Sequence, residues 1–316
     1  GIGTEPVMAG DILAIIQYVM QIMMSVTMLS MIFVMYPRCA ASADRICEVL
    51  DTENSIGDPE APKTSEGQRG YLTFRDVSFY FPGAKEPAVS HVSFEARPGE
   101  TTAIIGSTGS GKTALVGLIP RFYDVQEGEV LVDGVNVKDY DRKTLRKKIG
   151  YVPQKALLFK GTIMENIRFG DDSASDERVK EAAAIAQSTD FIEDKPEGFD
   201  SFIAQGGSNV SGGQRQRLAI ARAIVRKPEI YVFDDSFSAL DFKTDSALRQ
   251  ALARETENAT VVIVAQRVST IMNADRIIVM DEGKVMGIGT HRELLNTCET
   301  YQEIVRSQLS EEEMSA

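Results

Sequence analysis

Residues 106–113, GSTGSGKT, decide the fold, because they match the pattern G-x-x-x-x-G-K-[ST] directly after a short apolar run, TTAII, at 101–105. In this pattern the glycines let the backbone turn tightly, so that its N–H groups can surround an anion. The helix that follows adds its positive end, Lys112 would reach the β- and γ-phosphates of a nucleotide, and Thr113 would offer its hydroxyl to Mg²⁺. The candidate phosphate-binding residues are Gly106, Ser107, Thr108, Gly109, Ser110, Gly111, Lys112 and Thr113.

Further short apolar runs predict the sheet into which this loop is built. IYVFDD at 230–235, TVVIVAQ at 260–266 and DRIIVMD at 275–281 are continuous, as in parallel strands buried on both faces. Amphipathic helical stretches separate them, so we expect an α/β fold. YLTFRDVSFYF at 71–81 and HVSFEA at 91–96 alternate like half-buried strands.

The run at 230–235 ends in two adjacent carboxylates. Asp234, at the end of an apolar strand, is the expected carboxylate for Mg²⁺. Asp235 follows it, where a carboxylate could act on a reacting water. Gln154, in the loop of YVPQKALLF at 151–159, could touch the same Mg²⁺ or that water. We therefore take Asp235 as a catalytic candidate, and Thr113, Gln154 and Asp234 as metal ligands.

A second helix start that could bind an anion lies in residues 209–224, NVSGGQRQRLAIARAI. Ser211 suits the N-cap, and the glycines after it leave the positive end of the helix bare. The helix should stop near Lys227-Pro228. The candidate binding residues here are Ser211, Gly212, Gly213 and Gln214.

Residues 12–36 carry no charge and are long enough to cross a bilayer core of roughly 30 Å. Acidic residues precede this segment and Arg38 and Arg45 follow it, so the positive-inside tendency places everything after residue 37 in the cytoplasm. Gln17, Gln21 and Ser25 share one helix face, which suits either interhelical hydrogen bonds or a wet cavity. We expect a multi-pass protein of the cell membrane.

Composition and the positions of polar, Pro- and Gly-containing segments indicate the partners, the compartment and the domain boundaries. A formal charge of −12 over 316 residues argues against a nucleic-acid partner, and three cysteines without pairing or metal spacing suit a reducing compartment. We expect the last transmembrane helix and its cytoplasmic extension at 1–50, a polar linker at 51–69, the nucleotide-binding domain at 70–310 and an acidic tail at 311–316. One helix cannot enclose a pathway and the first residue is Gly1, so we expect further transmembrane helices ahead of this sequence.

Taken together, residues 70–310 resemble the ATPase domain of ABC transporters, of the exporter type with membrane spans fused ahead of it. In this resemblance 106–113 is the Walker A motif, Gln154 the Q-loop, VSGGQ at 210–214 the signature, YVFDD the Walker B motif and SALD at 238–241 the D-loop. It implies a RecA-like core, an antiparallel β-subdomain, a helical signature subdomain at about 156–226, and ATP with Mg²⁺ as cofactors. Phe81 stands where an aromatic ring, usually Tyr, stacks on adenine.

The resemblance also implies a partner. Two such domains pair head to tail, and each ATP lies between one chain's Walker A motif and the other chain's signature. Binding closes the pair, and hydrolysis reopens it to drive the spans.

Two positions depart from the family pattern. Asp235 stands where a Glu polarises the attacking water, and it is one methylene shorter. Gln266 stands where a histidine contacts the γ-phosphate, and an amide cannot carry the positive charge. The signature is nearly intact, with Val210 for the usual Leu. We therefore expect a degenerate, slow site in a heterodimeric exporter whose signature completes the partner's active site.

Alternatives remain open from the sequence. A homodimeric exporter requires that Asp235 be a competent base, and an ATP-gated channel or regulator would use binding alone. A soluble ABC ATPase would have no use for the uncharged span at 12–36. The expected partners are a second ABC half-transporter, the lipid bilayer and a small amphiphilic substrate, either multidrug-like or lipid-like, without nucleic acid.

Overall fold

The computed structural model describes residues 9–52, 54–65 and 67–308, and the chain divides into two compact units between Gly57 and Asp58. The predicted tail at 311–316 lies outside the described residues. The predicted linker at 51–69 spans the boundary between the two units.

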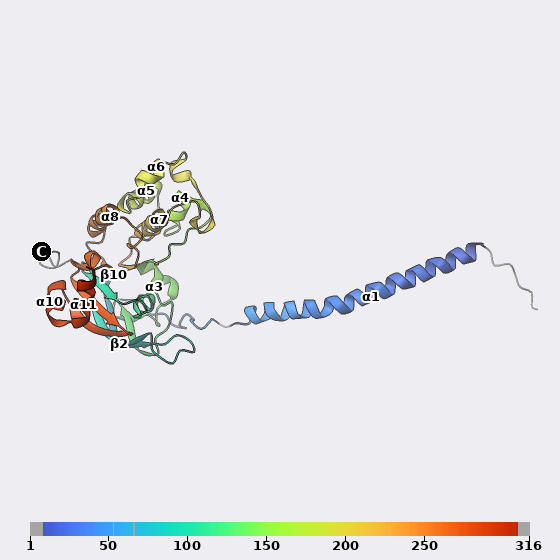
Figure 1. Ribbon diagram of the computed structural model, residues 1–316, viewed down its shortest axis with the longest axis horizontal. Coiled ribbons are helices and arrows are strands. Elements are labelled where there is room, and N and C mark those ends of the chain that lie inside the picture. The colour runs from blue at the N-terminus through green and yellow to red at the C-terminus, as the bar shows by residue number, and fades with distance from the viewer. Residues whose placement is uncertain (1–8, 53, 66, 309–316) are drawn as a thin grey trace, which may run out of the picture. The chain divides into compact units, whose positions relative to one another are not determined.

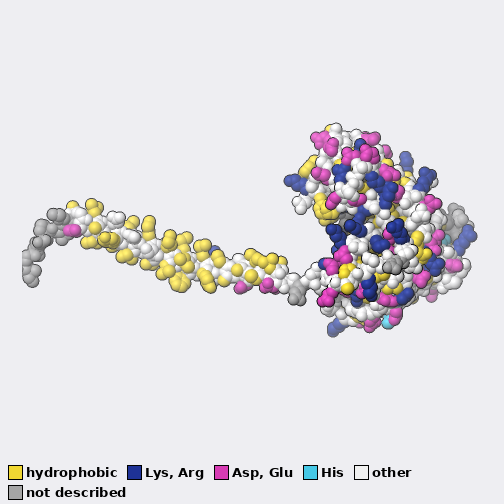
Figure 2. Space-filling model, turned by 180° about the vertical axis from the view of Figure 1, so that it is seen from behind, with side chains coloured by type: hydrophobic (Ala, Val, Ile, Leu, Met, Phe, Trp, Pro, Cys, Tyr) yellow, Lys and Arg dark blue, Asp and Glu magenta, His cyan; other side chains and the backbone are white. Residues whose placement is uncertain are grey.

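The first unit is one long helix, α1, from Ala9 to Leu50. Its 42 residues give a length of about 63 Å, more than the hydrocarbon core of a bilayer. Within Ala9–Leu50 no residue is buried, and Figure 2 shows apolar side chains along the whole helix. The helix is long and apolar enough to cross a membrane. The hydroxyl of Ser25 donates to the carbonyl of Gln21 at 2.9 Å, so this polar group is satisfied inside the helix.

The second unit is built on a six-stranded sheet in the order β12-β11-β3-β10-β9-β6. All its pairings are parallel except that of β11 with β12. A four-stranded antiparallel sheet, β2-β1-β4-β5, lies beside it, and β7 pairs with β8. The strands are β1 (Leu72–Phe79), β2 (Val89–Ala96), β3 (Thr101–Gly106), β4 (Glu127–Val132), β5 (Val135–Asn136), β6 (Ile149–Val152), β7 (Gly161–Thr162), β8 (Phe202–Ile203), β9 (Ile230–Asp234), β10 (Thr260–Val264), β11 (Arg276–Asp281) and β12 (Lys284–Gly289).

Helices cover this framework, and Figure 1 shows α4, α5, α6 and α7 gathered in one lobe. The helices are α2 (Lys112–Gly117), α3 (Arg142–Lys148), α4 (Ile163–Arg168), α5 (Asp176–Ile185), α6 (Thr189–Glu193), α7 (Gly212–Ile224), α8 (Phe242–Glu255), α9 (Val268–Ile271), α10 (His291–Thr297) and α11 (Glu299–Gln308). The strand predicted at 91–96 begins two residues earlier, because the pairing of β2 with β1 starts at Val89, so His91 lies inside β2.

The central strands are apolar on both faces because each face packs against a different core. In β9, Tyr231 and Phe233 belong to the cluster under the helical lobe, whereas Ile230 and Val232 belong to the cluster under the antiparallel sheet. The same alternation runs through β10 and β3. This two-sided burial explains the continuous apolar runs, and it confirms the predicted α/β fold.

Candidate nucleotide-binding site

The Walker A loop joins the end of β3 to the start of α2. Gly111, with φ of 93°, precedes α2, and a Cβ there would lie 2.1 Å from the carbonyl oxygen of Ala88. At Gly106 a Cβ would lie 2.0 Å from the carbonyl oxygen of Met280. Side chains are therefore excluded at both positions, which keeps the backbone close to its neighbours and its N–H groups available to an anion.

Lys112 folds over this loop. Its ammonium donates to the carbonyl oxygens of Gly106 at 2.9 Å and Ser107 at 2.6 Å, and to the hydroxyl of Ser110 at 3.2 Å. Burial lowers the pKa of Lys112, and the charges of Asp235 and Asp234 oppose that shift. These hydrogen bonds hold the ammonium against the loop, where it could bind a phosphate.

Asp234 is buried at the end of β9 and holds two neighbours. Its carboxylate accepts from the hydroxyl of Thr113 at 3.1 Å and from the hydroxyl of Tyr151 at 3.1 Å. Burial raises the pKa of Asp234, and these two hydrogen bonds oppose the rise. A hydroxyl and a carboxylate at this separation are hard oxygen ligands that fit Mg²⁺. Within the described ranges no group of three or more His, Cys, Asp or Glu forms a metal site of its own.

Asp235 has a different set of partners. The side-chain amides of Gln154 and Gln266 both donate to its Oδ2, at 3.1 Å and 2.7 Å. Its backbone is fixed as well, because its N–H donates to the carbonyl of Val264 at 3.0 Å and its carbonyl accepts from Ser238 at 2.9 Å. Asp235 has φ of 47°, in the left-handed region that Asp tolerates better than most residues.

Phe81 is half exposed and belongs to an aromatic group beside the loop. Its ring meets Phe79 edge-on with centroids 4.9 Å apart and Tyr123 with centroids 5.4 Å apart. A partly exposed aromatic ring of this kind can stack on a planar base. Sequence reasoning missed Tyr123, because nothing in the chain places residue 123 beside residue 81.

The signature residues begin α7. The hydroxyl of Ser211 accepts from the N–H of Gln214, whose side-chain oxygen accepts from the N–H of Ser211, which is a complete capping box. Gly212 is exposed and Gly213 is half-buried. Further along α7, the amide of Gln216 donates to the carbonyl of Pro153 at 3.2 Å, next to Gln154. The helix predicted from Ser211 is present, and it ends at Ile224.

The structure thus brings the Walker A loop, Asp234, Asp235, Gln154 and Gln266 together through hydrogen bonds. Sequence reasoning missed Tyr151, although it stands only three residues before Gln154. Its register beside Val232 in β9 brings its hydroxyl within reach of Asp234. Sequence reasoning also missed Asp281, which accepts a hydrogen bond from the hydroxyl of Ser107 at 3.0 Å although the two residues lie 174 positions apart.

Comparisons with known proteins agree with this geometry. A sequence model described as ABC transporter matches residues 89–238. An uncharacterized ABC transporter ATP-binding protein of Mycobacterium tuberculosis is 46% identical over 303 residues, covering 95% of this chain and 52% of the relative. The ABC transporter ATP-binding protein YfiB of Bacillus subtilis is 43% identical, covering 96% and 52%.

Exporter-type proteins are also among the relatives. An ATP-dependent lipid A-core flippase of Desulfotalea psychrophila is 41% identical over 263 residues, covering 83% of this chain and 46% of the flippase. A bacterial Atm1-family ABC exporter with ATP bound superposes with a TM-score of 0.82 at 33% identity, covering 96% of this chain and 53% of that one. The chain spans about half the length of the curated relatives it matches. The second unit of this chain therefore has the fold of an ABC ATPase domain, with residues 89–238 matching the family's sequence.

Proposed function

We propose that this chain is the ATP-binding subunit of a membrane exporter, and that its own nucleotide site binds MgATP but hydrolyses it slowly. The observation that carries the proposal is the environment of Asp235. This residue replaces the family's glutamate, and its Oδ2 is engaged by the amides of Gln154 and Gln266. Both donors are neutral, so neither supplies the positive charge of the family's histidine.

The length of Asp235 bears on the rate. A carboxylate one methylene shorter lies roughly 1 Å further from a water placed for a glutamate, and a misplacement of that size costs about 10²-fold. The residues that hold the nucleotide remain intact: the Walker A loop, Lys112, Thr113 and Asp234. When bound, Mg²⁺ would neutralise charge on the phosphates, with Thr113, Gln154 and Asp234 as the ligands from this chain.

The signature supports the assignment of a heterodimer. In the head-to-tail arrangement of the family, Ser211, Gly212 and Gly213 serve the partner's nucleotide. The capped start of α7 presents these residues intact. We propose that this signature completes a fully active site on a second ABC half-transporter, while the chain's own site supports binding and closure.

The membrane assignment rests on α1, whose residues 12–36 are uncharged. We propose that α1 is one of several transmembrane helices of a multi-pass protein of the cell membrane, with the ATPase domain in the cytoplasm. The exported substrate would be a small amphiphile, which is consistent with the lipid A-core flippases among the relatives.

Reverting the two departures tests the degenerate site. In the full transporter in lipid nanodiscs, the Asp235→Glu, Gln266→His double variant should hydrolyse this chain's ATP about 10²-fold faster than the wild type. Single-turnover hydrolysis of radiolabelled MgATP measures this rate. The two single variants show how much of the increase in rate comes from each substitution. Asp275→Glu and Gln302→His make the same chemical changes elsewhere and should leave the rate unchanged.

Equal, fast rates in the wild type and the double variant would instead establish Asp235 as a competent base, and a homodimeric exporter would then replace the heterodimer. If the wild-type complex binds ATP but neither site turns over, an ATP-gated channel or regulator becomes the better assignment.

A further inference from the structure

The last residue of α11, Gln308, makes a pair of hydrogen bonds to the segment that carries Gln266. Its side-chain amide donates to the carbonyl oxygen of Gln266 at 2.8 Å. Its side-chain oxygen accepts from the N–H of Val268 at 2.9 Å. One amide side chain therefore spans the backbone on both sides of Arg267.

This contact satisfies a helix start that the local sequence leaves uncapped. Arg267 is the N-cap of α9 and makes no side-chain cap hydrogen bond. The N–H of Val268 belongs to the first turn of α9, where backbone donors have no partner inside the helix. Gln308 supplies the acceptor from an element 40 residues further along the chain.

The helix that carries Gln308 is firmly seated. Tyr301 and Val305 of α11 are fully buried in the same core as Val268 and Ile271 of α9. The hydroxyl of Tyr301 also lies 2.7 Å from Nδ1 of His291 in α10. The helix that carries Gln308 is therefore packed into the same core as α9.

The segment it holds leads directly to Asp235. The side chain of Gln266 donates to Asp235 Oδ2 at 2.7 Å, and the carbonyl of the same residue accepts from Gln308. A side chain can hold a donor on one carboxylate oxygen only while its own backbone is fixed. The side chain of Gln308, the backbone carbonyl of Gln266 and the side-chain amide of Gln266 thus connect α11 to the carboxylate of Asp235.

We propose that Gln308 is a positioning residue for ATP hydrolysis at this chain's own site: it fixes the backbone of Gln266 so that the amide of Gln266 stays on Asp235. The inference rests on the proposed function, because it takes hydrolysis at this site as the reaction. It adds a residue of α11, outside every motif of the site, to the machinery that orients the catalytic carboxylate.

A double-mutant cycle in the full transporter tests this. Gln308→Ala should slow single-turnover hydrolysis of this chain's ATP about three- to tenfold, the effect of losing one positioning hydrogen bond. In a Gln266→Ala background the same substitution should have no effect on the rate, because no side chain is left to position. The melting temperature should fall equally in both backgrounds, since the contact with Val268 is lost in each.

Two further variants separate positioning from stability. Gln308→Glu keeps an acceptor for the N–H of Val268 but cannot donate to the carbonyl of Gln266, so it should lose rate like Gln308→Ala while keeping more of the melting temperature. Gln302→Ala removes an amide of the same helix that donates to Leu295 at 2.9 Å, and it should leave the rate unchanged.

The proposal is overturned if Gln308→Ala leaves the wild-type rate unchanged, if it slows both backgrounds equally, or if Gln308→Glu hydrolyses like the wild type. These outcomes are distinct from failure of the proposed function. A fast wild-type site would refute slow hydrolysis, yet the coupling between positions 308 and 266 would still be read from the same cycle.

Discussion

Asp234 and Asp235 are neighbours in the chain but have separate partners. Asp234, the last residue of β9, meets the hydroxyls of Thr113 and Tyr151, and Asp235, in the left-handed region, meets the amides of Gln154 and Gln266. The turn in the backbone between them separates a carboxylate suited to a cation from one suited to a water. The role of each aspartate can therefore be tested by substituting one of its hydrogen-bond partners and leaving the aspartate in place.

The partner of Asp234 that no motif contains is Tyr151. Tyr151→Phe removes the hydroxyl that orients the carboxylate, so the Mg²⁺ concentration for half-maximal ATP binding should rise about tenfold. A titration of ATP binding against Mg²⁺ measures this. Tyr140→Phe is the matched control: its hydroxyl donates to the carbonyl of Val132 at 3.0 Å, so stability should fall by about 1 kcal/mol without a change in Mg²⁺ dependence. An unchanged titration for Tyr151→Phe would contradict this role.

Among the elements, α7 differs from two other helices that begin with a capping box. In α4 and α10 the box is completed by Glu165 and Glu293, which place a carboxylate in the first turn. In α7 it is completed by Gln214, and no acidic residue stands in its first turn. The positive end of α7 is thus capped without being neutralised, which suits the proposed contact with a partner's nucleotide.

Replacing the cap tests the signature at this scale. Ser211→Ala should cost about 1 kcal/mol of stability and also lower the ATP turnover of the complex. Thr290→Ala, in the capping box of α10, should cost a similar amount of stability and leave turnover unchanged. Unfolding curves and steady-state ATPase of the two variants give the comparison. Equal turnover in both would remove the case for Ser211 as more than a cap.

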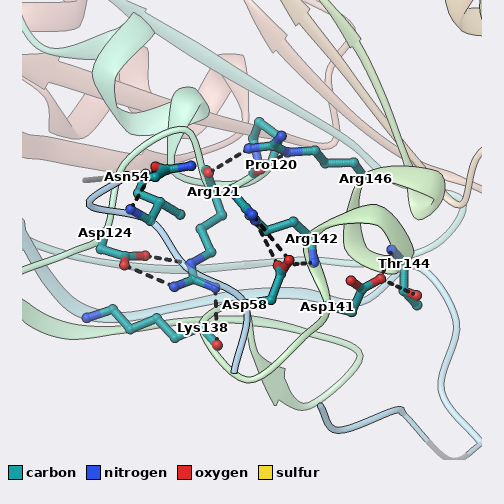
Figure 3. Close-up of polar contacts among 11 residues, drawn as sticks. Asn54, Asp58, Pro120, Arg121, Asp124, Lys138, Asp141, Arg142, Thr144 and Arg146 are labelled. Atoms are coloured by element: carbon teal, nitrogen blue, oxygen red, sulfur yellow. Dashed lines mark hydrogen bonds and ion pairs between the residues drawn. The ribbon is translucent and has the colours of Figure 1, made fainter. Parts of the chain in front are cut away.

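For the whole molecule, the second unit begins at an ion pair. Figure 3 shows Asp58 against Arg142 of α3, whose backbone N–H, Nε and Nη2 donate to the carboxylate at 3.0, 2.8 and 3.2 Å. The side chain of Lys63 reaches Asp139 at 2.7 Å nearby. The first residues of the second unit are thus bound to Arg142 of α3 and to Asp139 in the loop before it, within the segment predicted as a polar linker.

This pair has a defined pH dependence. Hydrogen bonds from the Arg142 side chain, then from its backbone, lower the pKa of Asp58 to about 2 from 3.8. A depressed carboxyl pKa stabilises the folded state above the unfolded value, and the gain is lost as pH falls from about 4 towards 2. The melting temperatures of the wild type and Asp58→Asn should therefore differ at pH 7 and converge as pH falls. In an Arg142→Gln background the difference at pH 7 should be smaller, because the side-chain ion pair is lost and the backbone N–H of residue 142 still donates to Asp58.

The sequence by itself determined the features that depend on neighbours along the chain. The strand, glycine loop and helix at 101–117 follow from local backbone rules, and so does the N-cap at Ser211. The continuous apolar runs predicted a buried parallel sheet because two-sided burial leaves no polar face. The identities of Asp235 and Gln266, and hence the hypothesis of a slow site, needed no structure.

Only the tertiary structure decided which side chains meet. Gln154 and Gln266 lie 81 and 31 residues from Asp235, and Gln308 lies 42 residues from Gln266, yet each pair is joined by a hydrogen bond. The parallel register of β3, β10, β9 and β6 gathers these strand ends at one edge of the sheet. A hydrogen bond forms only within about 3.5 Å, and that separation depends on register and helix packing, which spacing along the chain does not encode.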